Sequence, residues 1–327
     1  MHADAMLPPK DRLTICFAHA AYQLQDHFVR RQTGIGSFEV RTREELERRV
    51  GDADVVVVSG LWRNDLLGAA KRLRFIQSVS AGTDQFDREK LKERGVRLAS
   101  ARGVNARAVS EHAIALILAL ARKLPEARDN QAKHNWRGMI SDVSQREDEL
   151  GGKTLLIIGL GDIGSRAARL AKAFDLRVIG IKRDPALGGQ DADSVHGLAE
   201  LKALLPQADF VLLTCPLTKE TEKIIDADAL SRMKKSAYLV NAARGGCVDE
   251  NALIQALEKG TIAGAAIDVA AQEPLASASP LWDFGNVLIT PHTAGETRRY
   301  EDNVLDILVE NLERLWRGES RLRNEVV

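Results

Sequence analysis

The sequence predicts an α/β protein with two lobes, each built on a parallel β-sheet. Short β-branched apolar runs alternate with segments of helical spacing in both halves of the chain, and this alternation is typical of parallel sheets. The runs are apolar almost throughout, which indicates strands that are buried on both faces. The chain has 327 residues, more than one hydrophobic core usually organises, so we expect two domains.

In the first half, four runs have the composition of strands: LTICFA from Leu13, VVVVSG from Val55, LRFIQSVS from Leu73 and VRLAS from Val96. A helix is expected over about 108–122, and it is so apolar that it must be buried. Trp62 and Arg63, which follow the second run, are expected to be an exposed loop pair, and the alternative is a loop that reaches a ligand cleft.

The second half repeats this rhythm with six further runs. They are TLLIIG from Thr154, LRVIGI from Leu176, FVLLTC from Phe210, AYLVNAA from Ala237, IAGAAIDVA from Ile262 and VLITPH from Val287. No short-period repeat is present, which argues against a solenoid. The sequence therefore predicts a second parallel sheet over this half.

Composition and charge exclude several classes of function. Lys plus Arg and Asp plus Glu both number 46, so no net field favours nucleic acid or an anionic membrane surface. The N-terminal MHADAMLPPKDR lacks the apolar core of a signal peptide, and the longest apolar run, 113–121, is too short to span a bilayer. Cys16, Cys215 and Cys247 are odd in number and lack metal-ligand spacing. We expect a cytoplasmic protein with buried, reduced thiols and no metal.

A glycine motif follows the strand that begins at Thr154. Gly159, Gly161 and Gly164 form the pattern GxGxxG, and a helical run comes directly after it. In a dinucleotide site the first glycine makes the tight turn, the second lets the backbone approach the pyrophosphate, and the third lets helix and strand pack closely. The alternative is a glycine-rich turn in an unrelated α/β protein. The GIG at 34–36 lacks this setting and is interpreted as a loop.

The end of the next strand indicates which dinucleotide is bound. NAD sites usually have an acidic residue there for the ribose hydroxyls, whereas this sequence has Lys182 and Arg183. Two cations suit the 2′-phosphate of NADP, so NADP(H) is favoured. NAD(H) remains possible, because Asp184 could bind the ribose if the strand ends later.

Three more segments follow predicted strands, and each brings a polar group. They are 241–246 with Arg244, 268–275 with Glu273, and 290–295 with His292. The carboxyl ends of parallel strands line one crevice, so these side chains should converge. Reduction of a 2-oxo acid needs a cation for the carboxylate, a proton donor for the oxygen, and a carboxylate that keeps the donor protonated.

In this order the segments closely resemble the D-isomer-specific 2-hydroxyacid dehydrogenase family, and the likeness runs from the loop at 79–84 to residues 322–327. The resemblance implies that Arg244 binds the substrate carboxylate, that His292 is the acid/base, and that Glu273 orients His292. It also implies that the backbone of Ser80, Ala81 and Gly82 holds the substrate carboxylate.

The expected cofactor contacts come from two sources. The motif and the strand end give Gly159, Gly161, Gly164, Lys182 and Arg183, and the resemblance adds Asp162, Ile163, Cys215, Pro216, Ala242, Arg244, Asp268, His292 and Gly295. Lys182 and Arg183 stand where many members of the family have an acidic residue, which bears on the choice of NAD and not on the chemistry. The sequence Thr214-Cys215-Pro216 also differs from the common form, which bears only on the local packing there.

The family further implies two Rossmann-like or flavodoxin-like lobes with a cleft between them. The substrate domain would be discontinuous, 1–103 with 298–327, around a dinucleotide domain at 104–297. A homodimer is expected, in which Trp136 of the polar stretch 130–149 could anchor an arm. An ordinary loop tryptophan is the alternative.

Two other functions on the same scaffold are alternatives to a 2-hydroxyacid dehydrogenase. One is an NAD(P)-sensing binding protein without turnover, which Arg244, Glu273 and His292 together disfavour. The other is a formate or phosphite dehydrogenase, and Glu273 disfavours the formate type. His112, in the buried helix, is interpreted as a structural histidine rather than a second base. The 2-oxo acid itself is left open among glyoxylate, hydroxypyruvate, pyruvate and bulkier acids.

Overall fold

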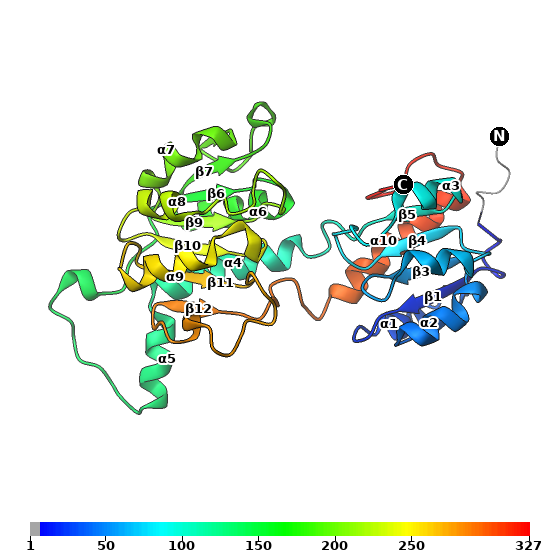
Figure 1. Cartoon of the computed structure of the whole chain (residues 1–327), viewed down its shortest axis with the longest axis horizontal. Helices are drawn as coiled ribbons and strands as arrows, with labels where there is room; N and C mark the ends of the chain where they lie inside the picture. The colour runs from blue at the N-terminus through cyan, green and yellow to red at the C-terminus, as the bar shows by residue number, and fades with distance from the viewer. Residues whose placement is uncertain (1–6) are drawn as a thin grey trace. The chain divides into compact units, whose positions relative to one another are not determined.

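A computed structural model describes residues 7–327 and divides them into two compact units (Figure 1). Unit 1 contains the chain up to Asn105 together with Thr297–Val327, and unit 2 is Ala106–Glu296. Residues 1–6, which open the segment examined above for a signal peptide, lie outside the described residues. None of the helices within residues 7–327 has the length and apolar character that a membrane span requires.

Unit 1 is a parallel sheet with helices on both faces, and its strand order is β2-β1-β3-β4-β5. Its strands are β1 Thr14–Ala18, β2 Gly36–Val40, β3 Val55–Val58, β4 Phe75–Ser78 and β5 Arg97–Ala99. Its helices are α1 Leu24–Arg30, α2 Arg43–Arg49, α3 Arg88–Glu93 and α10 Tyr300–Trp316, with short 3-10 turns at η1 Val50–Asp52 and η2 Asn64–Gly68.

Alternate residues of each strand in unit 1 enter two separate cores. Ile15 and Phe17 of β1 pack with Val304 and Leu308 of α10 on one face. The residues between them, such as Cys16, enter the core on the opposite face. Strands buried on both faces explain why their sequences read as unbroken apolar runs.

Trp62 is buried in unit 1, contrary to the prediction of an exposed loop pair. Its side chain is fully buried, contacts the Phe86 ring at a centroid distance of 5.7 Å, and donates from Nε1 to Asn64 Oδ1 at 3.1 Å. The prediction of an exposed loop pair was wrong for Trp62, because the indole fills the core under the turn, while Arg63 is exposed. Trp62 therefore cannot line a substrate pocket.

Unit 2 contains a seven-stranded parallel sheet of order β12-β11-β10-β9-β6-β7-β8. Its strands are β6 Thr154–Ile158, β7 Arg177–Ile181, β8 Ser194–His196, β9 Phe210–Leu213, β10 Tyr238–Asn241, β11 Gly264–Ile267 and β12 Val287–Ile289. Its helices are α4 Ala106–Ala121, α5 Leu124–Ala132, α6 Asp162–Lys172, α7 Leu201–Leu204, α8 Ala227–Arg232 and α9 Glu250–Glu258. Its 3-10 turns are η3 Val143–Gln145, η4 Pro185–Leu187, η5 Leu198–Glu200, η6 Leu205–Gln207, η7 Gly245–Cys247 and η8 Pro280–Trp282.

Helix α4 is buried against one face of this sheet. Its apolar residues, among them Val109, Ala113 and Ile117, share a core with α6 and with the strands. Helices α7, α8 and α9 cover the opposite face. The apolar segment predicted over 108–122 is therefore a buried helix, as expected.

The two units share one topology. Strands β7-β6-β9-β10-β11 of unit 2 repeat the order β2-β1-β3-β4-β5 of unit 1. The first strand of each sheet also begins with the same contact. Asp54 Oδ2 accepts from the Thr14 amide of β1 at 2.9 Å, and Asp209 Oδ2 accepts from the Thr154 amide of β6 at 2.8 Å. The prediction of an α/β protein with two parallel-sheet lobes is confirmed.

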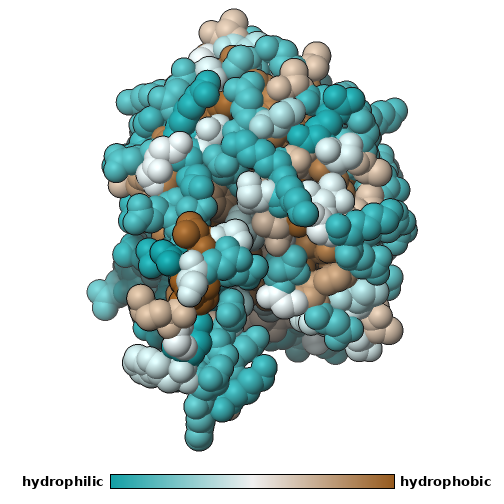
Figure 2. All heavy atoms as spheres, turned by 90° about the vertical axis from the view of Figure 1, so that its left-hand side faces the viewer, coloured by the Kyte–Doolittle hydropathy of each residue, from teal (hydrophilic) through white to brown (hydrophobic). Residues whose placement is uncertain are grey.

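An arm follows α5 and stands away from the sheet of unit 2 (Figure 1). Trp136 is 98% exposed and Met139 is 100% exposed, and Val143 is exposed as well. A hollow of about 540 Å³ lies between the arm and α5. Figure 2, which looks onto this side, shows hydrophobic side chains in small separate groups among hydrophilic ones.

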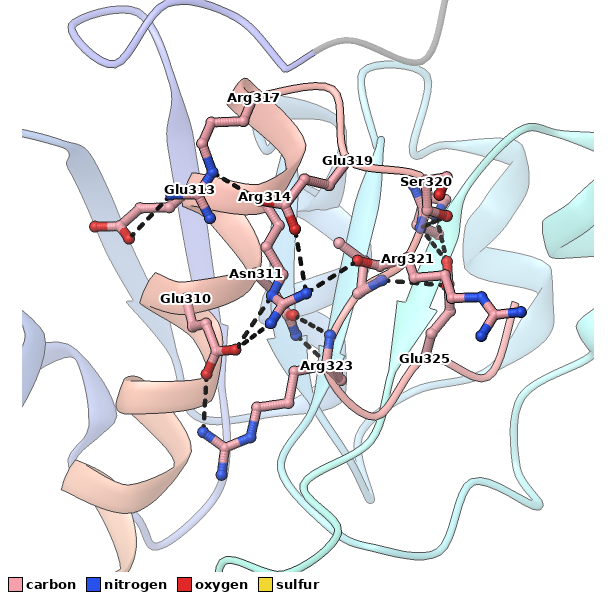
Figure 3. A network of polar contacts seen from close by, with 12 residues as sticks. Glu310, Asn311, Glu313, Arg314, Arg317, Glu319, Ser320, Arg321, Arg323 and Glu325 are labelled. Carbon is pink, nitrogen blue, oxygen red and sulfur yellow. Dashed lines mark hydrogen bonds and ion pairs between the residues drawn. The ribbon is translucent and has the colours of Figure 1, made fainter.

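The last residues of unit 1 are tied to α10 and to the edge of the sheet (Figure 3). Glu325 pairs with Ala99 of β5 as an antiparallel bridge, and its carboxylate accepts from Arg97 Nε at 2.6 Å. The Arg323 amide donates to Asn311 Oδ1 on α10 at 2.8 Å. This network covers β5, which would otherwise be an open edge strand.

Candidate active site

The three glycines after β6 have different surroundings. A Cβ on Gly159 would lie 2.5 Å from the Cys215 amide nitrogen, and its φ is +105°. A Cβ on Gly164 would lie 2.3 Å from the Gly159 carbonyl oxygen, whereas nothing lies within 4 Å of one on Gly161. Gly159 therefore allows the tight turn after β6, and Gly164 allows α6 to pack closely against this turn. Gly161 leaves open space in front of α6. A dinucleotide pyrophosphate fits this arrangement.

The segment after β9 braces the glycine turn. Thr214 Oγ1 donates to the Gly159 carbonyl at 2.8 Å, and Cys215 is buried beside it. A hydrogen bond with the Cys247 thiol, together with burial, raises the pKa of the Cys215 thiol above its ordinary value. Cys215 is therefore a neutral packing residue at this edge. Cys16 and Cys247 are buried too, as the sequence predicted.

Strand β7 ends at Ile181, so Lys182 and Arg183 are the first residues beyond it. Lys182 Nζ donates to the Gly188 carbonyl at 3.1 Å, and Arg183 is exposed. Asp184 Oδ1 accepts from the Ala186 amide at 3.1 Å and caps the turn η4. The strand thus ends before the two cations, and the carboxylate of Asp184 is engaged in its own turn.

Arg244 lies in the turn that follows β10. Asn241 fixes this turn, because its Oδ1 accepts from the Ala243 amide at 3.0 Å and its Nδ2 donates to the Arg244 carbonyl at 3.1 Å. A Cβ on Gly245 would lie 1.8 Å from the Ala270 carbonyl oxygen. Only glycine allows the Arg244 turn to lie so close to the loop after β11, and the Arg244 side chain is exposed there.

Glu273 and His292 form a hydrogen-bonded pair. Glu273 Oε2 lies 2.7 Å from His292 Nδ1, while Oε1 accepts from the Ala270 amide at 3.2 Å. The side chains are 41% and 48% exposed respectively. An ionised carboxylate can only accept, so Nδ1 carries the proton of this bond. The other ring nitrogen, Nε2, is thereby left as the one that can exchange a proton with a ligand.

Asp268 holds the loop that carries His292. Its carboxylate is buried and accepts from Thr290 Oγ1 at 2.6 Å, from the Thr293 amide at 3.0 Å and from the Ala294 amide at 3.1 Å. The His292 amide donates to the Asp268 carbonyl at 2.7 Å. The sequence predicted Asp268 as a cofactor contact, but it did not predict that Asp268 holds the His292 loop. The position of Asp268 could have indicated this, since a carboxylate directly after a buried strand readily accepts from nearby amides.

Arg244, Glu273 and His292 follow β10, β11 and β12, which are neighbours in the sheet. The three side chains therefore start from adjacent strands at one edge of the sheet. The other predicted cofactor contacts lie along the same edge: Asp162 and Ile163 at the start of α6, Pro216 after β9, Ala242 after β10 and Gly295 after β12.

The Ser80–Gly82 loop belongs to unit 1 and follows β4. Ser80 Oγ donates to the Gly82 carbonyl at 2.9 Å and lies 2.7 Å from Ser59 Oγ. Tyr300 Oη donates to the Val79 carbonyl at 2.8 Å and supports the start of the loop. The assignment of Ser80, Ala81 and Gly82 to a substrate carboxylate stays a prediction.

Comparison with known proteins identifies the family. The model of the D-isomer specific 2-hydroxyacid dehydrogenase NAD-binding domain matches residues 114–294. A glyoxylate reductase from Thermofilum pendens is 35% identical over 280 residues, which are 85% of this chain and 83% of that protein. A D-3-phosphoglycerate dehydrogenase from Methanocaldococcus jannaschii is 36% identical over 293 residues, 87% of this chain. The chain spans only 54% of that protein's length.

Solved structures agree with the sequence comparison. A D-lactate dehydrogenase with NAD⁺ from Lactobacillus jensenii superposes with a TM-score of 0.81 at 26% identity, and covers 96% of this chain and 99% of its own. Fold, glycine motif and matched sequence all agree, and the chain belongs to the D-isomer specific 2-hydroxyacid dehydrogenase family.

Proposed function

We propose that the protein is an oxidoreductase that transfers a hydride between NAD(P)H and a small 2-oxo acid, and so interconverts this acid and a D-2-hydroxy acid. It acts on the CH–OH group of its donor. The observation that carries the proposal is the Glu273–His292 pair, with Nδ1 and Oε2 2.7 Å apart, on loops next to the Arg244 turn. The names of the relatives, glyoxylate reductase and D-3-phosphoglycerate dehydrogenase, support the reaction class.

Each member of the trio has a separate task in the reductive direction. The Arg244 guanidinium binds the substrate carboxylate through two parallel hydrogen bonds. Protonated His292 donates the Nε2 proton to the carbonyl oxygen as negative charge develops there. Glu273 fixes the ring through Nδ1, and its negative charge faces the positive charge of the proton donor. A nicotinamide dinucleotide, when bound, supplies the hydride.

The dinucleotide is proposed to bind in unit 2, along Gly159, Gly161 and Gly164. We propose that unit 2 is the dinucleotide domain expected at 104–297, and that unit 1 is the substrate domain expected at 1–103 with 298–327. We propose NADP(H) as the preferred cofactor, because Lys182 and Arg183 directly follow β7. Cations at this place attract a 2′-phosphate, which an acidic residue would repel.

We also propose that the protein is a homodimer whose contact includes the arm after α5. Trp136 and Met139 are almost wholly exposed on the arm. Helix α5, which precedes the arm, has no buried residue. Tryptophan and methionine are enriched in protein interfaces relative to the rest of the surface. Sedimentation at micromolar concentration should give twice the chain mass, and Trp136→Ala with Met139→Ser should shift it toward one chain mass. A parent that sediments as a monomer would contradict the dimer.

The buried thiols of all three cysteines support the proposal of a reducing, cytoplasmic location.

The proposed reaction is tested with a panel of 2-oxo acids, which includes glyoxylate, hydroxypyruvate and pyruvate, with NADPH and NADH in turn. At least one acid should be reduced, and where reduction creates a stereocentre, as with pyruvate and hydroxypyruvate, the product should be the D-isomer. His292→Ala should lower kcat about 10²–10⁴-fold, the usual contribution of a positioned general acid. Arg244→Ala should mainly raise KM for the acid, because a charge-assisted contact is lost in both ground and transition states.

The control for the panel is Arg232→Ala, an exposed cation of unit 2 that pairs with Asp228 and lies on α8. This variant should keep the parent's kcat and KM. Dinucleotide binding without reduction of any acid would favour the sensing protein instead. Unchanged kcat in His292→Ala would remove His292 from the mechanism.

A further inference from the structure

The backbone of His292 has an uncommon conformation. Its φ is +56°, in the left-handed region that residues with a Cβ rarely adopt. Such a conformation persists only where surrounding contacts over-determine it. The contacts that hold this loop therefore decide where the imidazole points.

Asp268 provides most of these contacts. Its carboxylate accepts from the amides of Thr293 and Ala294, directly after His292, and its carbonyl accepts from the His292 amide. The carboxylate is buried, 3% exposed, so its own orientation must be set by neighbouring donors. A buried carboxylate with fixed donors acts as a rigid anchor.

The Thr290 hydroxyl connects this anchor to a distant helix. Thr290 Oγ1 donates to Asp268 Oδ1 at 2.6 Å and lies 3.0 Å from His112 Nε2. A hydroxyl has one hydrogen, and that of Thr290 is donated to Asp268. Thr290 Oγ1 can then only accept from His112, so Nε2 carries a hydrogen and donates the hydrogen bond. His112 is on α4, 178 residues away in sequence.

Helix α4 is a firm support for this chain of hydrogen bonds. Val109 and Ala113, on either side of His112, are buried in the core between α4, α6 and the sheet. His112 itself is partly exposed, at 24% of its side chain, and Nε2 also lies 3.7 Å from Asp268 Oδ1. Packing thus fixes the helix, and the hydrogen bond between His112 and Thr290 ties the loop to it.

We propose that His112 and Thr290 are positioning residues for the acid/base His292, acting through Asp268. The hydrogen bonds from His112 to Thr290 and from Thr290 to Asp268 hold the His292 loop in its left-handed conformation and so fix the ring relative to Glu273. Neither residue touches substrate or cofactor in this role. The inference rests on the proposed function only in treating His292 as the acid/base.

The test compares two substitutions at each position. Thr290→Val removes the hydroxyl and keeps the shape, whereas Thr290→Ser restores the hydroxyl. His112→Leu removes the donor, whereas His112→Gln keeps an N–H. Glu111→Gln is the matched control, because Glu111 is next to His112 on α4 but faces Arg166 at 3.4 Å and is exposed.

Two readouts are measured on the full-length protein. The first is hydrogen exchange of the Thr293 and Ala294 amides without substrate, which should become at least tenfold faster in Thr290→Val and His112→Leu. The second is steady-state kinetics, where kcat should fall about 10- to 100-fold, as expected for a misplaced catalytic group, with little change in cofactor affinity. Thr290→Ser, His112→Gln and Glu111→Gln should stay within about threefold of the parent.

Unchanged exchange and unchanged kcat in Thr290→Val would overturn the proposal. Equal loss in Thr290→Val and Thr290→Ser would overturn it too, since the hydroxyl would then not be the cause. A parent that reduces no 2-oxo acid would contradict the proposed function instead, and the exchange measurement would still report whether the loop depends on Thr290.

Discussion

His292 Nδ1 lies 2.7 Å from Glu273 Oε2, although the two residues come from loops that follow different strands. The bond fixes one ring nitrogen and leaves the other free for proton transfer. Both side chains are about half exposed, so the charge of Glu273 acts on His292 through a short contact rather than through deep burial. The pair should therefore be sensitive to the charge of Glu273.

Glu273→Gln tests this charge directly. The amide keeps the shape and can still face Nδ1, but it carries no negative charge. Reductive activity should fall, because the charge that faces the proton donor is lost while the shape of the pair is kept. The measurement is kcat/KM for the 2-oxo acid, with Glu258→Gln as a control, because Glu258 is exposed at the end of α9. An unchanged kcat/KM in Glu273→Gln would show that Glu273 is not the electrostatic partner of His292.

Lys182 and Arg183 should determine the choice of dinucleotide. Replacement of both by Ser should reduce kcat/KM for NADPH about tenfold or more, since hydrogen bonds to charged groups contribute roughly 1.5–3 kcal/mol. kcat/KM for NADH should change much less, and Lys202→Ser, a cation on α7, should alter neither value. A parent that clearly prefers NADH would refute the assignment and would make Asp184 the candidate ribose ligand.

Two glycines of the same motif should respond differently to alanine. Gly164→Ala places a Cβ 2.3 Å from the Gly159 carbonyl oxygen, so it should destabilise unit 2 by about 1–3 kcal/mol. Gly161→Ala meets nothing within 4 Å, so stability should stay within about 0.5 kcal/mol. It should nonetheless weaken dinucleotide binding. Denaturant unfolding and fluorescence titration separate the two effects, and equal destabilisation by both changes would contradict the packing argument.

His19 should make unit 1 sensitive to acid. Burial first, and then the Arg41 charge, lower the pKa of His19, and its Nδ1 accepts from the amides of Ala21 and Tyr22 at 3.1 and 2.9 Å. The unfolded chain therefore binds more protons than the folded one in the range just below pH 6.5. Stability should fall as the pH drops through this range.

The measurement for His19 is calorimetric unfolding at several pH values between about 5 and 7.5, the range in which histidine titrates. His19→Asn keeps an acceptor but cannot be protonated, so the loss of stability on acidification should shrink. His134→Gln, at an exposed position in the arm, serves as the control and should keep the parent's pH dependence. The same slope in His19→Asn and in the parent would assign the acid sensitivity to other groups.

Much of the fold could be predicted because the inner strands are apolar on both faces. The strands β2 and β8 were missed, and both lie at sheet edges. GSFEV in β2 has only one buried residue, and SVH in β8 has none. The GIG at 34–36 was interpreted as a loop, yet Gly36 begins β2. An edge strand is hydrogen-bonded on one side only and needs no apolar run, so its sequence carries little signal.

The candidate site likewise has residues that the sequence predicts and residues that it does not. Arg244, Glu273 and His292 could be predicted because each comes shortly after a recognisable strand. The supporting residues could not. The contact of His112 with Thr290 depends on how α4 packs against the sheet, and no local pattern encodes a partner 178 residues away. The burial of Trp62 likewise depends on Phe86, from another segment of unit 1.

The return of α10 to unit 1 has a consequence for the order of folding during synthesis. Val304 and Leu308 complete a core that begins with Ile15 and Phe17 on β1. A ribosome releases all of Ala106–Glu296 before it makes this helix. Unit 2 can therefore reach its final packing while one face of the first sheet is still uncovered, so the unit made second should be the first to fold completely.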